Sequence, residues 1–216
     1  MTFGRIDAKK LSVFPLADRR SLTGIEGIAA DPDAMRPVLP EALAGKINEV
    51  CRRVRGARQA DAGAMLTYGA HLIKNGGGTL LNRMIERGML THLATQGAGV
   101  IHDWEFAFQG VSTESVRENA PVGRFGSWDE TGRWINLAVA VGAAEGLGLG
   151  ESVGRLIETE KLVVPDPDEL ERSIVAAPND PLCAARADLL GMIRDHAIAP
   201  GVSIVPHPYK RYSVLA

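Results

Sequence analysis

The chain has 216 residues, of which 45% are hydrophobic and 23% are charged, and its 24 basic and 26 acidic residues give a net charge of −2. This composition is ordinary for a globular protein and excludes a disordered chain, a collagen and a small disulfide-stapled protein. The near balance of charges gives no support to a dedicated nucleic-acid-binding protein. A chain of this length can bury a sizeable core as one domain with extensions.

The cysteines and the apolar stretches indicate the compartment. Cys51 and Cys183 lie far apart, so they predict neither a zinc site nor a disulfide framework, and we interpret them as small buried residues in a reducing environment. Residues 1–20 hold no apolar run of signal-peptide length. The longest apolar stretch, residues 137–149, is interrupted by Glu145 and by glycines and is too short to cross a bilayer. We therefore expect a soluble, cytoplasmic protein without membrane or nucleic-acid partners.

The N-terminal part of the chain differs from the rest in its sequence pattern. Residues 1–40 predict an irregular arm, because four prolines interrupt every periodic pattern in them. Residues 41–216 then predict one α/β domain, which opens with a helix over residues 41–60. One face of this helix is apolar and the other is basic and solvated. The apolar positions are Leu43, Ile47, Val50 and Val54, and the basic positions are Arg52, Arg53, Arg55 and Arg58.

A strand–helix–strand–helix pattern follows. Residues 64–68 predict a short buried strand, and a glycine-rich turn leads to a helix over residues 79–87, capped by Thr79. Residues 90–95 predict a second strand, and residues 100–108 predict a helix after another glycine turn. This order is typical of a parallel sheet with flanking helices, so the fold class that we expect is α/β and Rossmann-like.

The second half of the domain predicts more helices and one strand. Its elements are helices over residues 130–144, 151–161 and 181–198, a helix start capped by Asp168, and a third strand over residues 202–205. The last residues, 213–216, resemble the beginning of a helix. We therefore expect the domain to be truncated at its C-terminus.

The strongest chemical signal lies at the second strand-to-helix turn. Thr95 and Gln96 lead into Gly97-Ala98-Gly99, where glycines two residues apart open a helix. Glycine allows a ligand to approach the backbone, and the free amides of a first helical turn favour a phosphate group. The third glycine of the dinucleotide fingerprint is absent, so alone the pattern also fits a tight turn without a ligand.

The first strand ends in Gly69-Ala70-His71. Neighbouring parallel strands end at the same edge of a sheet, so His71 and Gln96 are expected to face one crevice, with His102 and Asp103 above it. His102 and Asp103 are our candidate catalytic residues, and His102 is the better proton carrier near neutral pH. Metal ligation and a purely structural role remain open for these side chains, and Lys74 and His207 are further candidates on the same grounds.

Residues 68–76 and 93–103 carry a family resemblance. They look like the NAD-binding core of deoxyhypusine synthase, and they are similar to the NAD-binding domain of archaeal-type ornithine cyclodeaminases. The resemblance is good over residues 60–110 and weak as far as about residue 215. It implies a Rossmann-like NAD fold, a homo-oligomer, and hydride transfer on an amine or amino-acid substrate. It also implies contacts to the dinucleotide from Gly69, Ala70, His71, Thr95, Gln96, Gly97, Ala98 and Gly99.

The chain departs from that family in two respects. Where the family has two adjacent acids that hold the polyamine, this chain has Ile101 and His102, with only Asp103 retained. None of the six lysines has the sequence context of the catalytic lysine of the family, so we expect no deoxyhypusine synthesis by this chain. Two alternatives remain: a non-catalytic nucleotide-binding or interaction protein of the same fold, and a metal-dependent hydrolase using His71, His102, Asp103 and His207.

Overall fold

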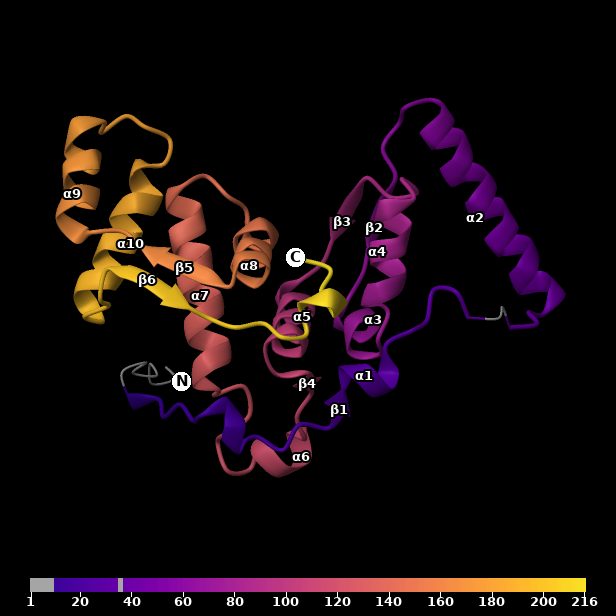
Figure 1. Ribbon diagram of the computed structural model, residues 1–216, viewed down its shortest axis with the longest axis horizontal. Coiled ribbons are helices and arrows are strands. Elements are labelled where there is room, and N and C mark those ends of the chain that lie inside the picture. The colour runs from indigo at the N-terminus through magenta and orange to yellow at the C-terminus, as the bar shows by residue number, and fades with distance from the viewer. Residues whose placement is uncertain (1–9, 35–36) are drawn as a thin grey trace, which may run out of the picture.

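The computed structural model describes residues 10–34 and 37–216, and it is mixed α/β with mostly helical secondary structure (Figure 1). The helices are α1 Ile25–Ile28, α2 Glu41–Gln59, α3 Ala70–Lys74, α4 Gly78–Glu86, α5 Gly97–Gln109, α6 Val116–Asn119, α7 Asp129–Ala144, α8 Leu149–Thr159, α9 Pro167–Ala176 and α10 Cys183–Asp195. The strands are β1 Thr23–Gly24, β2 Met65–Thr67, β3 His92–Ala94, β4 Val111–Ser112, β5 Lys161–Val164 and β6 Gly201–Ile204. Short 3-10 helices cover Leu16–Asp18 (η2) and Lys210–Tyr212 (η3).

The expected parallel pair is present. β2 and β3 run parallel, with Met65 opposite His92 and Thr67 opposite Ala94. The amide of Tyr68, just past β2, also donates to the carbonyl of Ala94 at 2.9 Å. Since α3 and α4 connect the two strands and α5 follows β3, the strand–helix–strand–helix prediction is confirmed, and both strand-to-helix junctions meet at one edge.

Helix α5 is the centre of the packing. Its Val100, Trp104 and Ala107 belong to one buried cluster, together with side chains from η2 and α8. Phe106, on another face of the helix, belongs to a second cluster with Ile73 of α3 and with side chains of α1 and α4. A helix that is apolar on several faces is one that the fold surrounds, and α5 accordingly lies between the α7–α8 part and the β2–β3 part of the molecule (Figure 1).

The third predicted strand exists but does not extend the parallel sheet. β6 pairs antiparallel with β5, a strand that the sequence did not indicate, and the register places Lys161 opposite Ile204. β5 alternates exposed and buried residues, so Leu162 and Val164 face a third core cluster with α7 and α10. The structure therefore shows a parallel pair and two separate antiparallel pairs among the described residues.

Several local expectations are corrected. The strand β2 is not buried, since the side chain of Met65 is 67% exposed. In α4 the side chain of Leu80 is 40% exposed, whereas that of Leu81 is buried. Helix α9 is capped by Asp166, whose carboxylate accepts from the amides two and three residues later, and not by Asp168. A side-chain acceptor caps a helix from the residue before its first turn, and the sequence pattern placed that residue two positions too late.

The predicted arm is also more ordered than its prolines suggest. Residues 1–9, 35 and 36 lie outside the described residues, but residues 10–34 contain η2, β1 and α1. Leu16 and Ile25 are buried in two different clusters. The arm thus contributes to the packed body of the domain.

Helix α2 forms as predicted but packs differently. Figure 1 shows it extending away from the rest of the molecule, and none of its residues is buried. Leu43, Ile47 and Val50 are between 40% and 59% exposed, so no part of residues 10–34 and 37–216 covers its apolar face. Within residues 10–34 and 37–216, no helix is both long enough and apolar enough to pass through a membrane.

We predict that Gly76 is required by the backbone of the turn between α3 and α4. Its φ is +81°, and a Cβ at this position would collide with the carbonyl oxygen of Ile28. Gly76→Ala should therefore lower the free energy of unfolding by about 2–4 kcal/mol. Gly191→Ala is the matched control: Gly191 lies within α10 with open space around it, so alanine should raise stability by about 1 kcal/mol. Urea denaturation measures both, and equal effects would contradict the prediction.

Candidate functional site

The carboxyl edge of the β2–β3 pair borders a cavity of about 360 Å³. The cavity lies between the strand ends, the first turn of α5 and the first turn of α8. It is lined by Tyr68, Leu93, Ala94, Thr95, Val100, Leu149, Gly150, Glu151, Val214 and Leu215. Ligands of open α/β sheets bind outside the carboxyl ends of the strands. Of the predicted dinucleotide contacts, Thr95 lines this cavity and the other seven do not.

The backbone amides at the start of α5 are only partly open. The side-chain oxygen of Gln96 caps the helix by accepting from the amide of Ala98 at 2.5 Å. The amide of Gly99 donates to the carbonyl of Gln96 at 2.8 Å. No described residue accepts a hydrogen bond from the amide of Gly97. Of the three predicted phosphate-binding amides, one is therefore open and the other two bond within the chain.

The two glycines of this turn have different surroundings. A Cβ on Gly99 would collide with Oγ1 of Thr95, so the close packing of α5 against β3 itself requires glycine there. A Cβ on Gly97 would meet nothing within 4 Å, and the same holds for Gly69 at the other junction. Neither residue has a left-handed φ. Neither a close contact with the described residues nor the backbone conformation therefore requires glycine at positions 69 and 97.

The remaining predicted contacts lie at the same edge. Gly69 is the N-terminal cap residue of α3, and Ala70 and His71 form the first turn of that helix. His71 and Gln96 are both exposed, and neither of them lines the cavity at this edge. The hydroxyl of Thr95 is buried beside the phenol of Tyr68.

Asp103, a predicted catalytic residue, has a different environment. It is 3% exposed, and its carboxylate accepts hydrogen bonds from the hydroxyl of Ser213 at 2.5 Å and from the amides of Val214 and Leu215. Burial raises the pKa of Asp103, and these hydrogen bonds oppose that rise. The structure therefore gives Asp103 the role of anchoring residues 213–215 to α5, with no part of the carboxylate at the edge.

His102 precedes Asp103 on α5, points toward β4 and is half-buried. Its Nδ1 is 2.8 Å from the hydroxyl of Ser112. Burial lowers the pKa of His102, and the positive charges of Lys74 and Arg19 lower it further, while Glu105 raises it. His102 is therefore neutral near pH 7 and able to accept a proton.

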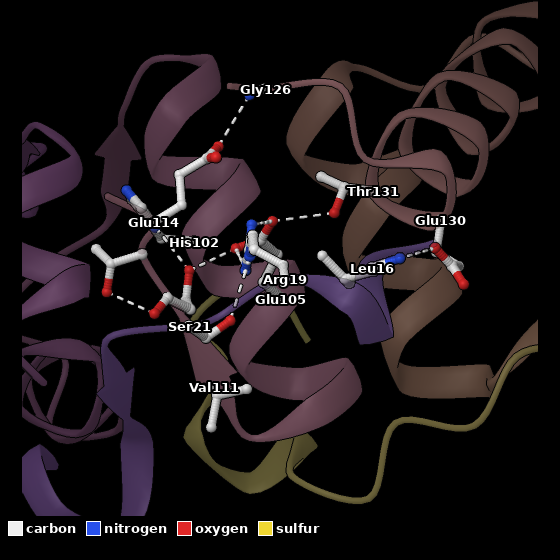
Figure 2. A network of polar contacts seen from close by, with 12 residues as sticks. Leu16, Arg19, Ser21, His102, Glu105, Val111, Glu114, Gly126, Glu130 and Thr131 are labelled. Atoms are coloured by element: carbon white, nitrogen blue, oxygen red, sulfur yellow. Dashed lines mark hydrogen bonds and ion pairs between the residues drawn. The ribbon is translucent and has the colours of Figure 1, made fainter. Parts of the chain in front are cut away.

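Behind His102 lies a buried network that the sequence did not reveal (Figure 2). The two terminal nitrogens of the Arg19 guanidinium donate to the two carboxylate oxygens of Glu105, each at 2.7 Å. Both side chains are almost fully buried. The hydroxyls of Ser112 and Thr131 donate to the same carboxylate at 2.6 Å and 3.0 Å. One signal was available: Glu105 is a charged residue between Trp104 and Phe106 in an apolar helix, where an acid is buried only with a partner.

The residues of the metal-hydrolase alternative do not converge. His207 is fully buried, with its ring at T-shaped angles to Trp104 and Phe108, and neither ring nitrogen has a hydrogen-bond partner. Asp103 is bound to the C-terminal segment. Across the part of the chain that the structure describes, no group of three or more His, Cys, Asp or Glu side chains could hold a metal ion.

Comparison with protein-family models, with curated proteins and with solved structures finds no match to this chain. What the structure establishes is a mixed α/β chain with a parallel strand pair. The resemblance to deoxyhypusine synthase and the roles that it implies remain predictions.

We predict that Asp103→Ala releases the C-terminal segment. The amides of Val214 and Leu215 lose their acceptor, so their hydrogen exchange should become fast and the free energy of unfolding should fall by about 2–4 kcal/mol. Asp195→Ala, an exposed change on α10, is the control and should alter neither quantity. Unchanged exchange at both amides in the Asp103 variant would show that the anchor lies elsewhere.

We predict that His207 makes the fold acid-sensitive. Burial lowers the pKa of His207 from 6.5 to about 4, so its neutral form stabilises the fold at neutral pH. This stability is lost as the pH falls from 6.5 towards 4, by up to about 3 kcal/mol. His207→Phe keeps the aromatic contacts and should flatten the pH dependence of the free energy of unfolding in that range. His196→Asn, at an exposed position, should leave it unchanged, and a steep profile in the phenylalanine variant would refute the prediction.

Proposed function

We propose that this chain binds a nicotinamide dinucleotide, NAD, at the carboxyl edge of β2–β3, as a deoxyhypusine synthase-like protein. The observation that carries the proposal is Gly97. Its amide has no acceptor among the described residues, it opens a 13-residue helix, and a Cβ at this position would meet no described atom within 4 Å. A phosphate group held at a helix N-terminus needs both a free amide and a close approach to the backbone.

The surroundings of Gly97 suit such a ligand. The parallel pair brings Gly69, which is equally open, to the neighbouring junction. The cavity beside the edge offers Tyr68 and the buried hydroxyl of Thr95 as polar groups among apolar walls. A mostly apolar cavity with a few polar groups is the usual composition of a cofactor site.

Gln96 determines how the diphosphate could be held. Its side chain occupies the amide of Ala98 but is itself exposed. A phosphate oxygen is a stronger acceptor than an amide oxygen, since charged hydrogen bonds are about twice as strong. We infer that Gln96 turns away and that the amides of Gly97 and Ala98 then bind the ligand together.

The reaction that we propose is oxidation or reduction at the carbon next to an amine. When bound, the dinucleotide supplies hydride acceptance and donation. The carboxylate of Glu151 lines the cavity and would attract a cationic amine or amino acid, in place of the acids that this chain lacks at residues 101 and 102. His102 holds or accepts the proton. A homo-oligomeric state and a cytoplasmic location belong to the same proposal.

The second candidate is a non-catalytic nucleotide-binding protein of the same fold. The enclosure of Asp103 favours it, because the acid retained from the family does not reach the cavity. Both candidates require the ligand at Gly97, and turnover with an amine in the presence of NAD distinguishes them.

The test is Gly97→Ala. Alanine fits the helical backbone and the open space, so the melting temperature of the variant should stay the same or rise. A methyl group in the path of the phosphate should weaken NAD binding at least tenfold, as measured by calorimetry with millimolar NAD. Gly45→Ala in α2, also in open space, should bind as the wild type does. The proposal fails if the wild-type chain does not bind NAD or if Gly97→Ala binds it equally well.

A further inference from the structure

A continuous chain of hydrogen bonds joins the buried Arg19–Glu105 pair to His102. Arg19 binds both oxygens of Glu105, Oε2 of Glu105 lies 2.6 Å from the hydroxyl of Ser112, and that hydroxyl lies 2.8 Å from Nδ1 of His102. Figure 2 shows His102 and Thr131 on opposite sides of the ion pair. The side chain of Ser112 is fully buried, so water does not compete for its hydroxyl.

Only one placement of the protons satisfies all of these hydrogen bonds. Glu105 is a carboxylate paired with a guanidinium, so it only accepts hydrogen bonds. The one hydroxyl proton of Ser112 is therefore donated to Glu105. With that proton used, the oxygen of Ser112 can only accept from His102, which requires a proton on Nδ1. In a neutral imidazole this leaves the lone pair on Nε2.

We propose that Arg19, Glu105 and Ser112 are positioning residues that hold His102 as the Nδ1–H tautomer and present Nε2 as a proton acceptor. The tautomer follows from the buried hydrogen bonds alone. The use of the proton acceptor in a reaction rests on the function proposed above.

The groups that face His102 keep Nε2 unprotonated. Burial lowers its pKa below 6.5, and the charges of Lys74 in α3 and of Arg19 in the N-terminal segment lower it further. His71 of α3 acts in the same direction, and Glu105 raises the pKa. Since the folded pKa is lower than the unfolded one, the neutral base predominates at pH 7 and is lost only as the pH falls through the folded pKa.

The proton transfer balances without a further reactant. Nε2 forms an N–H bond as the N–H or O–H bond of the substrate breaks, and the electron pair of that bond stays on the substrate atom. The imidazolium keeps its Nδ1–H bond to Ser112, and the negative charge of Glu105 stabilises it through the hydroxyl. The proton then returns to solvent.

Residues next to this hydrogen-bonded network line a surface depression of about 660 Å³. Lys74, whose charge acts on His102, lines it, and so do Thr113 and Glu114, which follow Ser112 directly in the chain. Both carboxylate oxygens of Glu114 already accept hydrogen bonds, one from the side-chain amide of Asn119 and one from the backbone amide of Gly126. This depression therefore does not replace the cavity with Glu151 as the place proposed for the amine.

The experiment is NMR of the protein with ¹⁵N-labelled histidine, recorded without any dinucleotide. His102→Gln identifies the signals of His102 among the five histidines of the chain. The wild type should show the proton on Nδ1 over the whole neutral range. Ser112→Ala removes the acceptor, so His102 should lose this preference and populate the Nε2–H form. Ser112→Thr keeps a hydroxyl and should restore the Nδ1–H form.

A chemical readout accompanies the spectra. Acylation of His102 by diethyl pyrocarbonate requires a lone pair on Nε2, so its rate should fall several-fold in Ser112→Ala and recover in Ser112→Thr. An unchanged tautomer and acylation rate in the alanine variant would overturn the proposal. Dinucleotide binding should be equal in all three proteins, since Ser112 does not line the cavity at the strand edge. The tautomer result therefore stands or falls separately from NAD binding.

Discussion

The ion pair between Arg19 and Glu105 is the contact on which the arrangement of this chain depends. Glu105 is 1% exposed in the middle of α5, and an unpaired carboxylate there would cost several kcal/mol. Arg19 supplies the counter-charge from 86 residues away and brings the N-terminal segment onto α5. The amide of Leu16 adds a bond to Glu130 at the start of α7. The segment that looks irregular in the sequence thus links two helices of the core.

A second buried acid of α5, Asp103, also holds a distant segment of the chain against this helix. Asp103 is buried as deeply as Glu105, but hydrogen bonds from residues 213–215 take the place of a cation. The hydroxyl of Ser213 also accepts from the amides of Leu215 and Ala216, the pattern of a helix N-terminal cap. Two acids of one helix therefore fix the two ends of the described chain. This explains why charged residues occur in an otherwise apolar helix.

Local patterns predicted the elements but not these contacts. Short apolar runs and glycine turns were enough to place β2, β3, α4 and α5, because these signals act over a few residues, whereas α3 was not predicted. The pairing of β5 with β6 and the partner of Glu105 depend on residues that are far apart in sequence. At the candidate site the sequence located the edge, but it treated Gly97 and Gly99 alike. Only the structure shows that Gly99 serves internal packing and that Gly97 does not.

The two halves of the proposed site lie on the same helix. Gly97 opens α5, and His102 follows five residues later, a rise of roughly 8 Å along the axis. The packing on several faces and the two buried acids leave α5 little freedom to rotate or shift. A ligand held at the helix N-terminus is therefore fixed relative to Nε2 of His102 by a rigid element, which is the condition for productive proton transfer. The ion pair in the core therefore also restrains the imidazole of His102, because Ser112 connects Glu105 to that ring by hydrogen bonds.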